Sequence, residues 1–254
     1  MATIKEIKAD LVAVTDANDP YLLELLGDER AGVKALVKRK QKQINDHQVK
    51  VADFKQRFAL ERELWNHGKK WVAGIDEVGR GCLAGPVVTA AVVLDESFDL
   101  ISVNDSKKLS AEVREELYPQ ILKEALSVGI GIYSNEEIDQ IGILNATKQA
   151  MKMAIANLNV VPQHLLVDAV QIPIDIPKSV MFKGDSKSNS IAAASIVAKE
   201  YRDHLMHSYN DLYPGYGFDQ NVGYGTKQHL LGLESLGVTP IHRRTFEPVP
   251  NFLK

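Results

Sequence analysis

The sequence predicts an α/β protein that carries a helical, charge-rich extension at its N-terminus. After about residue 70, short apolar runs alternate with longer stretches of helical periodicity, which is typical of a sheet flanked by helices. Before that point glycine and proline are scarce, and the residues favour helices. We therefore expect a helical extension over residues 1–70 and an α/β domain over residues 71–254, long enough to bury a proper core.

In the extension, helices are expected over residues 20–26 and 30–65. Apolar side chains of the second helix form an uneven stripe that consists of Val33, Leu36, Val37, Ile44, Phe54, Phe58 and Leu64. This is too little apolar material for an independent domain, so the extension is expected to pack on the rest of the chain or on a ligand.

The same stretch has a positive excess. Its basic residues are Arg30, Lys34, Lys38, Arg39, Lys40, Lys42, Lys50, Lys55 and Arg57, against only Asp46 and Asp53. The chain as a whole has a net charge of −3, so a basic extension accompanies an acidic body. Such a separation suits phosphate binding in one region and metal binding in another, but a solvated charged helix explains the run equally well.

The α/β domain is expected to contain five strands, over residues 71–75, 86–94, 127–133, 164–167 and 178–182. Helices are expected over residues 110–125, 135–157, 190–209 and 230–236. Ser110 is the candidate N-cap of the first, and Gly142 is expected to break the second into two pieces.

Acidic residues follow three of these strands. Asp76 and Glu77 come directly after the first, Asp168 after the fourth, and Asp185 shortly after the fifth. Ligands of open α/β sheets bind beyond the carboxyl ends of strands, and carboxylates gathered there repel one another unless a cation lies between them. Oxygen ligands without nearby cysteine favour Mg²⁺ or Mn²⁺ over zinc.

Each acidic position also has a simpler explanation. Asp76 and Glu77 make a common surface pair, Asp168 is able to cap a turn, and Asp185 is able to cap a helix. Neighbouring residues of a strand point to opposite faces, so Asp76 and Glu77 share a site only if the strand ends or bends there. Gly79 and Gly81 supply such a bend.

Several reactive residues are expected to be structural. The single cysteine, Cys82, excludes an intrachain disulfide and a cysteine zinc site, and it is expected to be a small buried side chain. His229 and His242 are expected on the surface or in the core rather than as acid–base groups, and Ser195 in helix packing. No apolar run is long enough to span a membrane, so a cytoplasmic protein is expected.

The segment Asp76-Glu77-Val78-Gly79-Arg80-Gly81, which continues to Val88, resembles the opening motif of the type 2 ribonucleases H. Four further blocks are similar to later motifs of that family, in the same order: Asp105-Ser106-Lys107-Lys108-Leu109, Leu166-Val167-Asp168-Ala169, Lys183-Gly184-Asp185 with the following residues 191–203, and Gly223-Tyr224-Gly225-Thr226-Lys227-Gln228-His229. The resemblance runs from about residue 71 to residue 246. The extension is shorter than that of ribonucleases HIII and is expected to be helical, which favours ribonuclease HII.

The resemblance implies a ribonuclease-H-like mixed sheet flanked by helices and a site of four carboxylates. Asp76 is implied as the central metal ligand, Glu77 and Asp168 as its companions, and Asp185 as a fourth, more loosely engaged ligand. Asp203 is the rival for the fourth place, but it is expected to face solvent or to pair with Arg202. The implied substrate-binding residues are Gly79, Arg80, Gly81 and Tyr224, which would sense the ribonucleotide, and Lys107, Lys108 and Lys183, which would hold phosphates.

The activity implied is two-metal hydrolysis of the RNA strand of RNA–DNA hybrids and nicking of DNA 5′ to embedded ribonucleotides, with 5′-phosphate and 3′-hydroxyl products. A monomer is expected, and recruitment by replication proteins is left open. Two alternatives stay open: a DNA-processing nuclease of the same fold, and a nucleic-acid-binding protein without activity. A nucleotide-binding protein is disfavoured because no phosphate-binding loop follows a strand.

Overall fold

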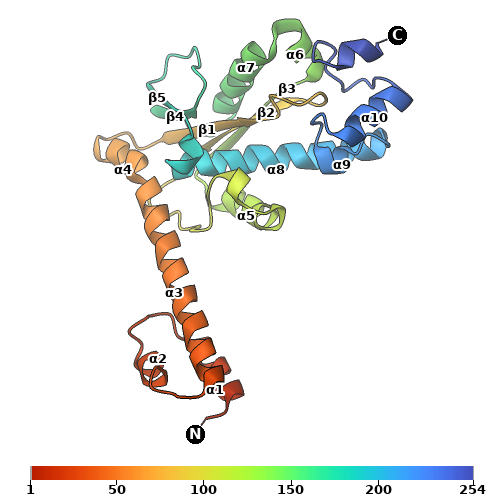
Figure 1. Cartoon of the computed structure of the whole chain (residues 1–254). Helices are drawn as coiled ribbons and strands as arrows, with labels where there is room; N and C mark the ends of the chain where they lie inside the picture. The colour runs from red at the N-terminus through yellow and green to blue at the C-terminus, as the bar shows by residue number, and fades with distance from the viewer. Residues whose placement is uncertain (1, 254) are drawn as a thin grey trace. The chain divides into compact units, whose positions relative to one another are not determined.

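The computed structural model describes residues 2–253. The chain divides into two compact units, Met1–Gln56 and Arg57–Lys254 (Figure 1). We call the first the N-terminal unit and the second, after the activity that the resemblance implies, the catalytic unit. The division falls inside a helix, earlier in the chain than the boundary that composition predicts at residue 70. That predicted boundary stays a prediction.

The N-terminal unit consists of α1 (Ile4–Asp10), α2 (Pro20–Leu25) and most of α3 (Ala31–Arg57). Thr3 starts α1 with a capping box that it forms with Glu6, and Asp19 caps α2. Apolar side chains of all three helices form one buried cluster of Ile7, Leu11, Val14, Leu22, Leu25, Val33, Val37 and Ile44. The first half of the apolar stripe of α3 therefore has its partner surface within the unit itself.

The helix expected over residues 30–65 is broken in the structure. α3 ends at Arg57, and α4 (Ala59–Asn66) follows after Phe58, whose backbone leaves the helical region at φ −83° and ψ 4°. The Phe58 ring lies 5.6 Å from that of Trp65 and 6.4 Å from that of Phe98, measured between centroids. Neither glycine nor proline marks this break, so aromatic packing within the catalytic unit, rather than a local signal, accompanies it.

The catalytic unit contains a mixed sheet of five strands in the order β3-β2-β1-β4-β5. The strands are β1 (Val72–Val78), β2 (Val87–Val93), β3 (Ser127–Tyr133), β4 (His164–Asp168) and β5 (Lys178–Met181). β2 pairs antiparallel with β1 and β3, whereas β4 runs parallel to β1 and β5 parallel to β4. The five strands expected from the sequence are confirmed, but β1 continues through Asp76 and Glu77 instead of ending before them.

Helices cover both faces of this sheet (Figure 1). α7 (Ile143–Ala156) packs on β2 and β3, and α8 (Asn189–Leu212) packs on β1 and β2. Both helices approach the sheet closely at glycines: a Cβ added to Gly131 would lie 1.9 Å from Ala150 O, and one added to Gly74 would lie 2.1 Å from the carbonyl carbon of Ser190. Gly74 thus marks the face of β1 that α8 covers.

The remaining elements are α5 (Ala111–Glu124), α6 (Asn135–Ile141), α9 (Phe218–Asn221), α10 (Lys227–Leu236) and the 3₁₀ turns η1 (Ser106–Lys108), η2 (Gly184–Ser186) and η3 (Val249–Phe252). The cap at Ser110 and the break at Gly142 are confirmed. α9 has no counterpart among the expected helices, and neither has α1 of the N-terminal unit. Within residues 2–253, no helix combines the length and apolar character needed to cross a membrane.

Candidate functional site

The pairing of β1 with β4 brings Asp76 beside Asp168. Ile75 of β1 is in register with Val167 of β4, so the next residue of each strand is an aspartate. Because side chains alternate along a strand, Asp76 shares the face of Gly74, which α8 covers, and Asp168 shares the face of Leu166. Leu166 packs against Ile191 of α8. Both aspartates therefore project on the α8 side of the sheet.

Asp185 joins them through η2, the turn that leads into α8. The Gly184 N–H donates a hydrogen bond of 2.8 Å to Asp168 Oδ1, which fixes η2 against the end of β4. Asp185 is buried, and its pKa is raised, first by that burial and then by the charge and hydrogen bonding of Asp105. Asp105 is thus a fifth carboxylate at this site. Asp105 opens one of the family-like motifs, but it follows no strand, so no local signal marks it as an acid of this site.

Glu77 reaches the same group although it alternates with Asp76. The turn that bends the chain begins after Val78, at Gly79, whose φ of +89° favours glycine. Burial raises the pKa of Glu77, Arg80 beside it lowers this pKa, and the charge of Asp168 raises it. Arg80 Nη1 donates a hydrogen bond of 3.2 Å to Glu77 Oε1, while Oε2 is buried without a hydrogen-bond partner.

The four carboxylates interact electrostatically. The pKa of Asp76 is raised well above its ordinary value, first by burial and then by the charges of Glu77, Asp168 and Asp185. Such a group is unstable as four bare anions and supplies only hard oxygen ligands, and Glu77 Oε2 lacks a partner. The residues present therefore fit a divalent cation of the magnesium or manganese type.

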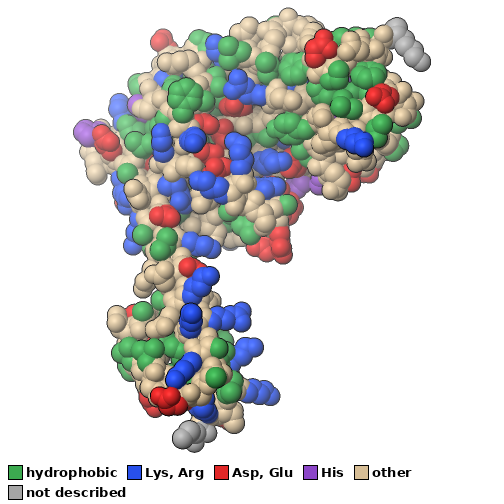
Figure 2. Space-filling view, in the orientation of Figure 1, with side chains coloured by type: hydrophobic (Ala, Val, Ile, Leu, Met, Phe, Trp, Pro, Cys, Tyr) green, Lys and Arg blue, Asp and Glu red, His purple; other side chains and the backbone are tan. Residues whose placement is uncertain are grey.

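Basic side chains surround these acids. The charge of Lys107 lowers the pKa of both Glu77 and Asp185, so Lys107 lies near both. Lys108 Nζ donates a hydrogen bond of 2.9 Å to Ser186 Oγ, which links η1 to η2, and Lys183 is exposed in a left-handed conformation. Figure 2 shows acidic side chains in the middle of one face of the catalytic unit, with lysine and arginine side chains around them.

The glycine–arginine–glycine turn and Tyr224 also lie together. A Cβ added to Gly81 would lie 3.9 Å from Tyr224 Cε1, so the ring stands over the exposed Gly81. Tyr224 is itself 44% exposed, and its pKa is raised by partial burial and then by the nearby Cys82. Cys82 is fully buried, as expected.

A buried arginine from the C-terminal segment binds the backbone carbonyls of the glycine–arginine–glycine turn. Arg243 is fully buried and donates hydrogen bonds to Gly79 O (2.6 Å), Arg80 O (2.9 Å) and Gly85 O (3.0 Å). In a trans peptide the N–H points opposite to the C=O. The N–H groups of Arg80 and Gly81 therefore point away from Arg243.

A second buried arginine connects the turn to residues 222–226, the loop that carries Tyr224 and that we call the tyrosine loop. Arg202 of α8 donates hydrogen bonds to Pro86 O (2.9 Å), Ala84 O (3.0 Å) and Val222 O (2.7 Å). The expectation that Asp203 faces solvent or pairs with Arg202 is wrong. Asp203 is buried and pairs with Lys199, because the guanidinium of Arg202 is turned to the main-chain carbonyls.

His229 and His242 are fully buried in the core, one of the two expected places. The Thr239 N–H donates to His242 Nδ1 (2.9 Å), so His242 carries its proton on Nε2 and donates to His229 Nε2 (2.9 Å). His229 then donates through Nδ1 to Tyr224 O (3.0 Å). Burial, and then His229, lower the pKa of His242 to about 4, so both rings are neutral supports of the tyrosine loop.

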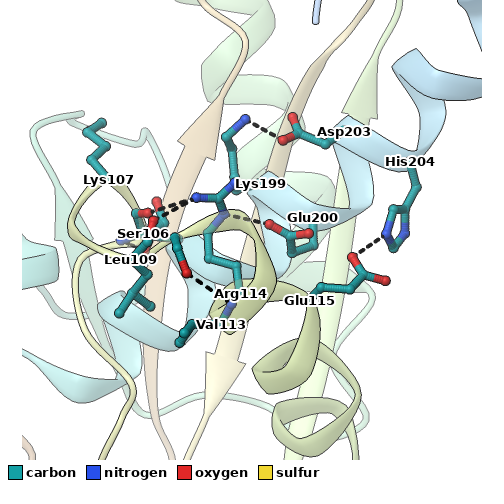
Figure 3. A network of polar contacts seen from close by, with 12 residues as sticks. Ser106, Lys107, Leu109, Val113, Arg114, Glu115, Lys199, Glu200, Asp203 and His204 are labelled. Carbon is teal, nitrogen blue, oxygen red and sulfur yellow. Dashed lines mark hydrogen bonds and ion pairs between the residues drawn. The ribbon is translucent and has the colours of Figure 1, made fainter. Parts of the chain in front are cut away.

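A polar network between α5 and α8 fastens η1 (Figure 3). Arg114 pairs with Glu200 at 2.6 Å and donates to Leu109 O (3.0 Å) and Ser106 O (3.4 Å). Glu115, Glu200 and His204 have possible ligand atoms within 4.8 Å of one another. The guanidinium of Arg114 already supplies the positive charge there, and His204 pairs with Glu115 at 2.8 Å, so we interpret this cluster as a structural network.

Comparison with known proteins gives a consistent family. A model described as "Ribonuclease HII" matches residues 73–249, and one described as "Ribonuclease HII N-terminal domain" matches residues 3–65. A protein named "Ribonuclease HII" from Pediococcus pentosaceus is 70% identical over 253 residues, which cover 100% of this chain and 99% of that protein.

Solved structures show the same fold. The ribonuclease H2 from Pyrococcus horikoshii OT3 is 26% identical with a TM-score of 0.62, over 72% of this chain and 96% of that one. Bst-RNase HIII, in a structure described as a complex with Mn²⁺, is 19% identical with a TM-score of 0.54, over 72% of this chain and 68% of that one. The expected ribonuclease-H-like mixed sheet with N-terminal helices is confirmed.

Proposed function

Because the chain belongs to the ribonuclease HII family, we propose that it is an endoribonuclease that hydrolyses the RNA strand of RNA–DNA hybrids and nicks DNA 5′ to embedded ribonucleotides. The observation that carries this proposal is that Asp76, Glu77, Asp168 and Asp185 lie together at one end of the sheet. The charges of the other three raise the pKa of Asp76, and the Gly184 N–H binds Asp168 and so places Asp185 beside it. Glu77 Oε2, which is buried without a hydrogen-bond partner, would be an oxygen ligand for a divalent cation.

In this proposal the four carboxylates hold Mg²⁺ or Mn²⁺, of which a manganese complex is described for Bst-RNase HIII. Asp76, Glu77, Asp168 and Asp185 would hold two such ions, which would supply activation of a water molecule and stabilisation of the leaving 3′ oxygen, with a 5′-phosphate and a 3′-hydroxyl as the products. Asp76 is the central ligand, since it is buried and the charges of Glu77, Asp168 and Asp185 all act on it. Burial and then Asp105 raise the pKa of Asp185, which suits a more loosely engaged fourth ligand.

The substrate is recognised by the neighbouring turn and loop. The N–H groups of Arg80 and Gly81 face away from Arg243 and are available to a sugar or phosphate, and no side chain at Gly81 obstructs them. Tyr224 stands beside them with its ring half exposed. Together they recognise the 2′-hydroxyl, the group that distinguishes RNA from DNA. Lys107, Lys108 and Lys183 contact the phosphates.

The alternatives are separated by one experiment. The chain is incubated with an RNA–DNA hybrid, a duplex containing one ribonucleotide, and an all-DNA duplex, each with Mg²⁺, with Mn²⁺ or with a chelator. We expect metal-dependent cutting of the first two and 5′-phosphate ends. Equal cutting of the all-DNA duplex would favour a DNA-processing nuclease, and binding without turnover would favour a non-enzymatic protein.

The proposal extends to a cytoplasmic monomer. Light scattering during size-exclusion chromatography, with and without a hybrid, measures the mass of the free protein and of the complex. A free mass near the 28.1 kDa of the chain is the expected result.

A further inference from the structure

Two buried, ionisable residues lie where the match to the N-terminal family model overlaps the catalytic unit. The N-terminal-domain match runs to residue 65, whereas the catalytic unit begins at Arg57. Arg57 at the end of α3 and Glu61 in α4 fall in the overlap, and they are 9% and 0% exposed. They belong by family alignment to the extension and by contacts to the catalytic unit.

Arg57 binds the segment that leads into η1. Its Nη2 donates a hydrogen bond of 2.6 Å to Val103 O, and its Nε donates one of 3.0 Å to Asn189 Oδ1. Two residues after Val103 comes Asp105, which raises the pKa of Asp185, and four residues after it comes Lys107, which lowers that pKa. Asn189 is the first residue of α8. One guanidinium therefore connects the η1 segment to the start of α8.

Glu61 binds the start of α8 itself. Its Oε1 accepts hydrogen bonds from Ser188 Oγ (2.5 Å) and from the Ser190 N–H (2.9 Å). Ser188 is the N-cap of α8, and its N–H donates to Gly184 O at 2.9 Å within the turn that carries Asp185. Glu61 is thus one hydrogen bond from the residue that closes the Asp185 turn.

These contacts converge on the two segments that complete the carboxylate site. Lys108 and Ser186 join η1 to η2, and Asp105 lies against Asp185. Arg114 fastens η1 to α8 through Ser106 O and Leu109 O (Figure 3), and Arg57 holds the segment just before η1 through Val103 O. A buried carboxylate and a buried guanidinium are costly to keep, and here their hydrogen bonds go to segments around the site rather than to each other.

We infer that Arg57 and Glu61 are positioning residues of the nuclease site, which hold η1 and the Asp185 turn in the geometry that the metal and the scissile phosphate require. This inference rests on the proposed function. Neither side chain touches the reacting atoms. They act through Val103, Ser188 and Asn189, so their removal loosens Asp185 and Lys107 while Asp76 and Asp168 stay in the sheet.

The test uses the full-length chain with Glu61→Ala, Glu61→Gln, Arg57→Ala and Arg57→Lys. Glu63→Ala, at an exposed position of the same helix, is the matched control. For each, kcat and KM for hybrid cleavage are measured against Mn²⁺ concentration, well below the melting temperature of the weakest variant. Mn²⁺ affinity is measured separately by calorimetry without substrate.

We expect the alanine variants to lose about 10-fold or more in kcat and to need more Mn²⁺, as when a residue supporting a metal ligand is removed, with KM little changed. Glu61→Gln keeps an oxygen acceptor for both donors and should stay within about 3-fold of wild type. Arg57→Lys should recover only part of the kcat that Arg57→Ala loses, because a single ammonium group replaces the planar guanidinium and its paired donors. The control should match wild type.

A merely structural role gives a different result. It would lower the melting temperature but leave kcat and Mn²⁺ affinity at wild-type values in the folded variants, and that result would overturn the inference. Arg57→Lys, which keeps a positive charge but should still lose part of kcat and of Mn²⁺ affinity, keeps the question answerable if an alanine variant does not fold. If the wild-type chain cleaves no hybrid but Glu61→Ala and Arg57→Ala still weaken Mn²⁺ binding, the proposed function fails and the positioning role stands.

Discussion

The N-terminal unit and the catalytic unit bury different kinds of side chain. Within residues 2–56, each buried side chain is apolar, and the charges lie outside, with basic side chains along α3 (Figure 2). The catalytic unit buries aspartates, glutamates, histidines and arginines. Apolar burial alone accounts for the first unit. Buried ionisable groups are costly and cluster at functional sites, so this difference locates the chemistry in the second.

The largest effect is expected where like charges are buried together. Asp76→Asn should reduce hybrid cleavage by about 100-fold or more, because it removes the central ligand. The same change should raise the melting temperature of the metal-free protein, since burial and the charges of three neighbouring carboxylates disfavour an ionised Asp76 and raise its pKa. Cleavage rates and melting curves with a chelator measure both. A fully active Asp76→Asn enzyme would contradict the ligand assignment.

The next effect concerns pH and the buried histidine pair. The pKa of His242 is lowered from 6.5 to about 4, and that of His229 is also lowered. Between pH 6.5 and pH 4 the unfolded chain therefore binds more protons than the folded chain does. The contribution of the pair to the free energy of unfolding is fully present above pH 6.5 and is lost as the pH falls towards 4. For His242 it amounts to about 3 kcal/mol.

Urea unfolding at pH 7 and pH 5 measures this loss. A variant with His229→Gln and His242→Gln should show a smaller difference between the two pH values, whereas His207→Gln, at an exposed position, should not. Equal acid dependence in the double variant and in wild type would show that other groups dominate.

A smaller effect is expected at the substrate surface. Tyr224→Ala should reduce cleavage beside a single ribonucleotide by about 10-fold, the equivalent of one hydrogen bond of about 1.4 kcal/mol. Tyr224→Phe, which keeps the ring over Gly81, should lose less. Cleavage of hybrid and single-ribonucleotide duplexes by both variants is the measurement. Unchanged rates and unchanged discrimination in Tyr224→Ala would place the sensor elsewhere.

The smallest effect is expected in the N-terminal unit. Lys38, Arg39 and Lys42 are exposed on α3, and Lys40 is partly exposed. If they bind phosphates, their joint change to glutamate raises KM and flattens the salt slope by about 0.9 for each phosphate that is no longer neutralised, while kcat stays unchanged. A truncation through α4 does not test this, because it also removes Arg57 and Glu61. Wild-type KM and salt dependence in a stably folded variant would make α3 a solvated helix.

Local sequence signals located most elements of the fold. Strands rich in valine and isoleucine, the cap at Ser110 and the break at Gly142 depend on backbone preferences that each residue carries with it. α9 was missed because a four-residue helix has too few turns for periodicity. The break at Phe58 was missed because rings distant in sequence, such as Phe98, accompany it.

The sequence by itself determined that acidic residues lie at or just beyond the C-terminal ends of three strands, since strand propensity and acidic residue types are both local. Which acids meet was decided by tertiary structure: the β1–β4 register pairs Asp76 with Asp168, and η1 brings Asp105 to Asp185. The hydrogen bonds of Arg243 to Gly79, and of Glu61 to Ser188, join residues far apart along the chain. No local pattern encodes such pairings, because a buried charge finds its partners only when the fold closes around it.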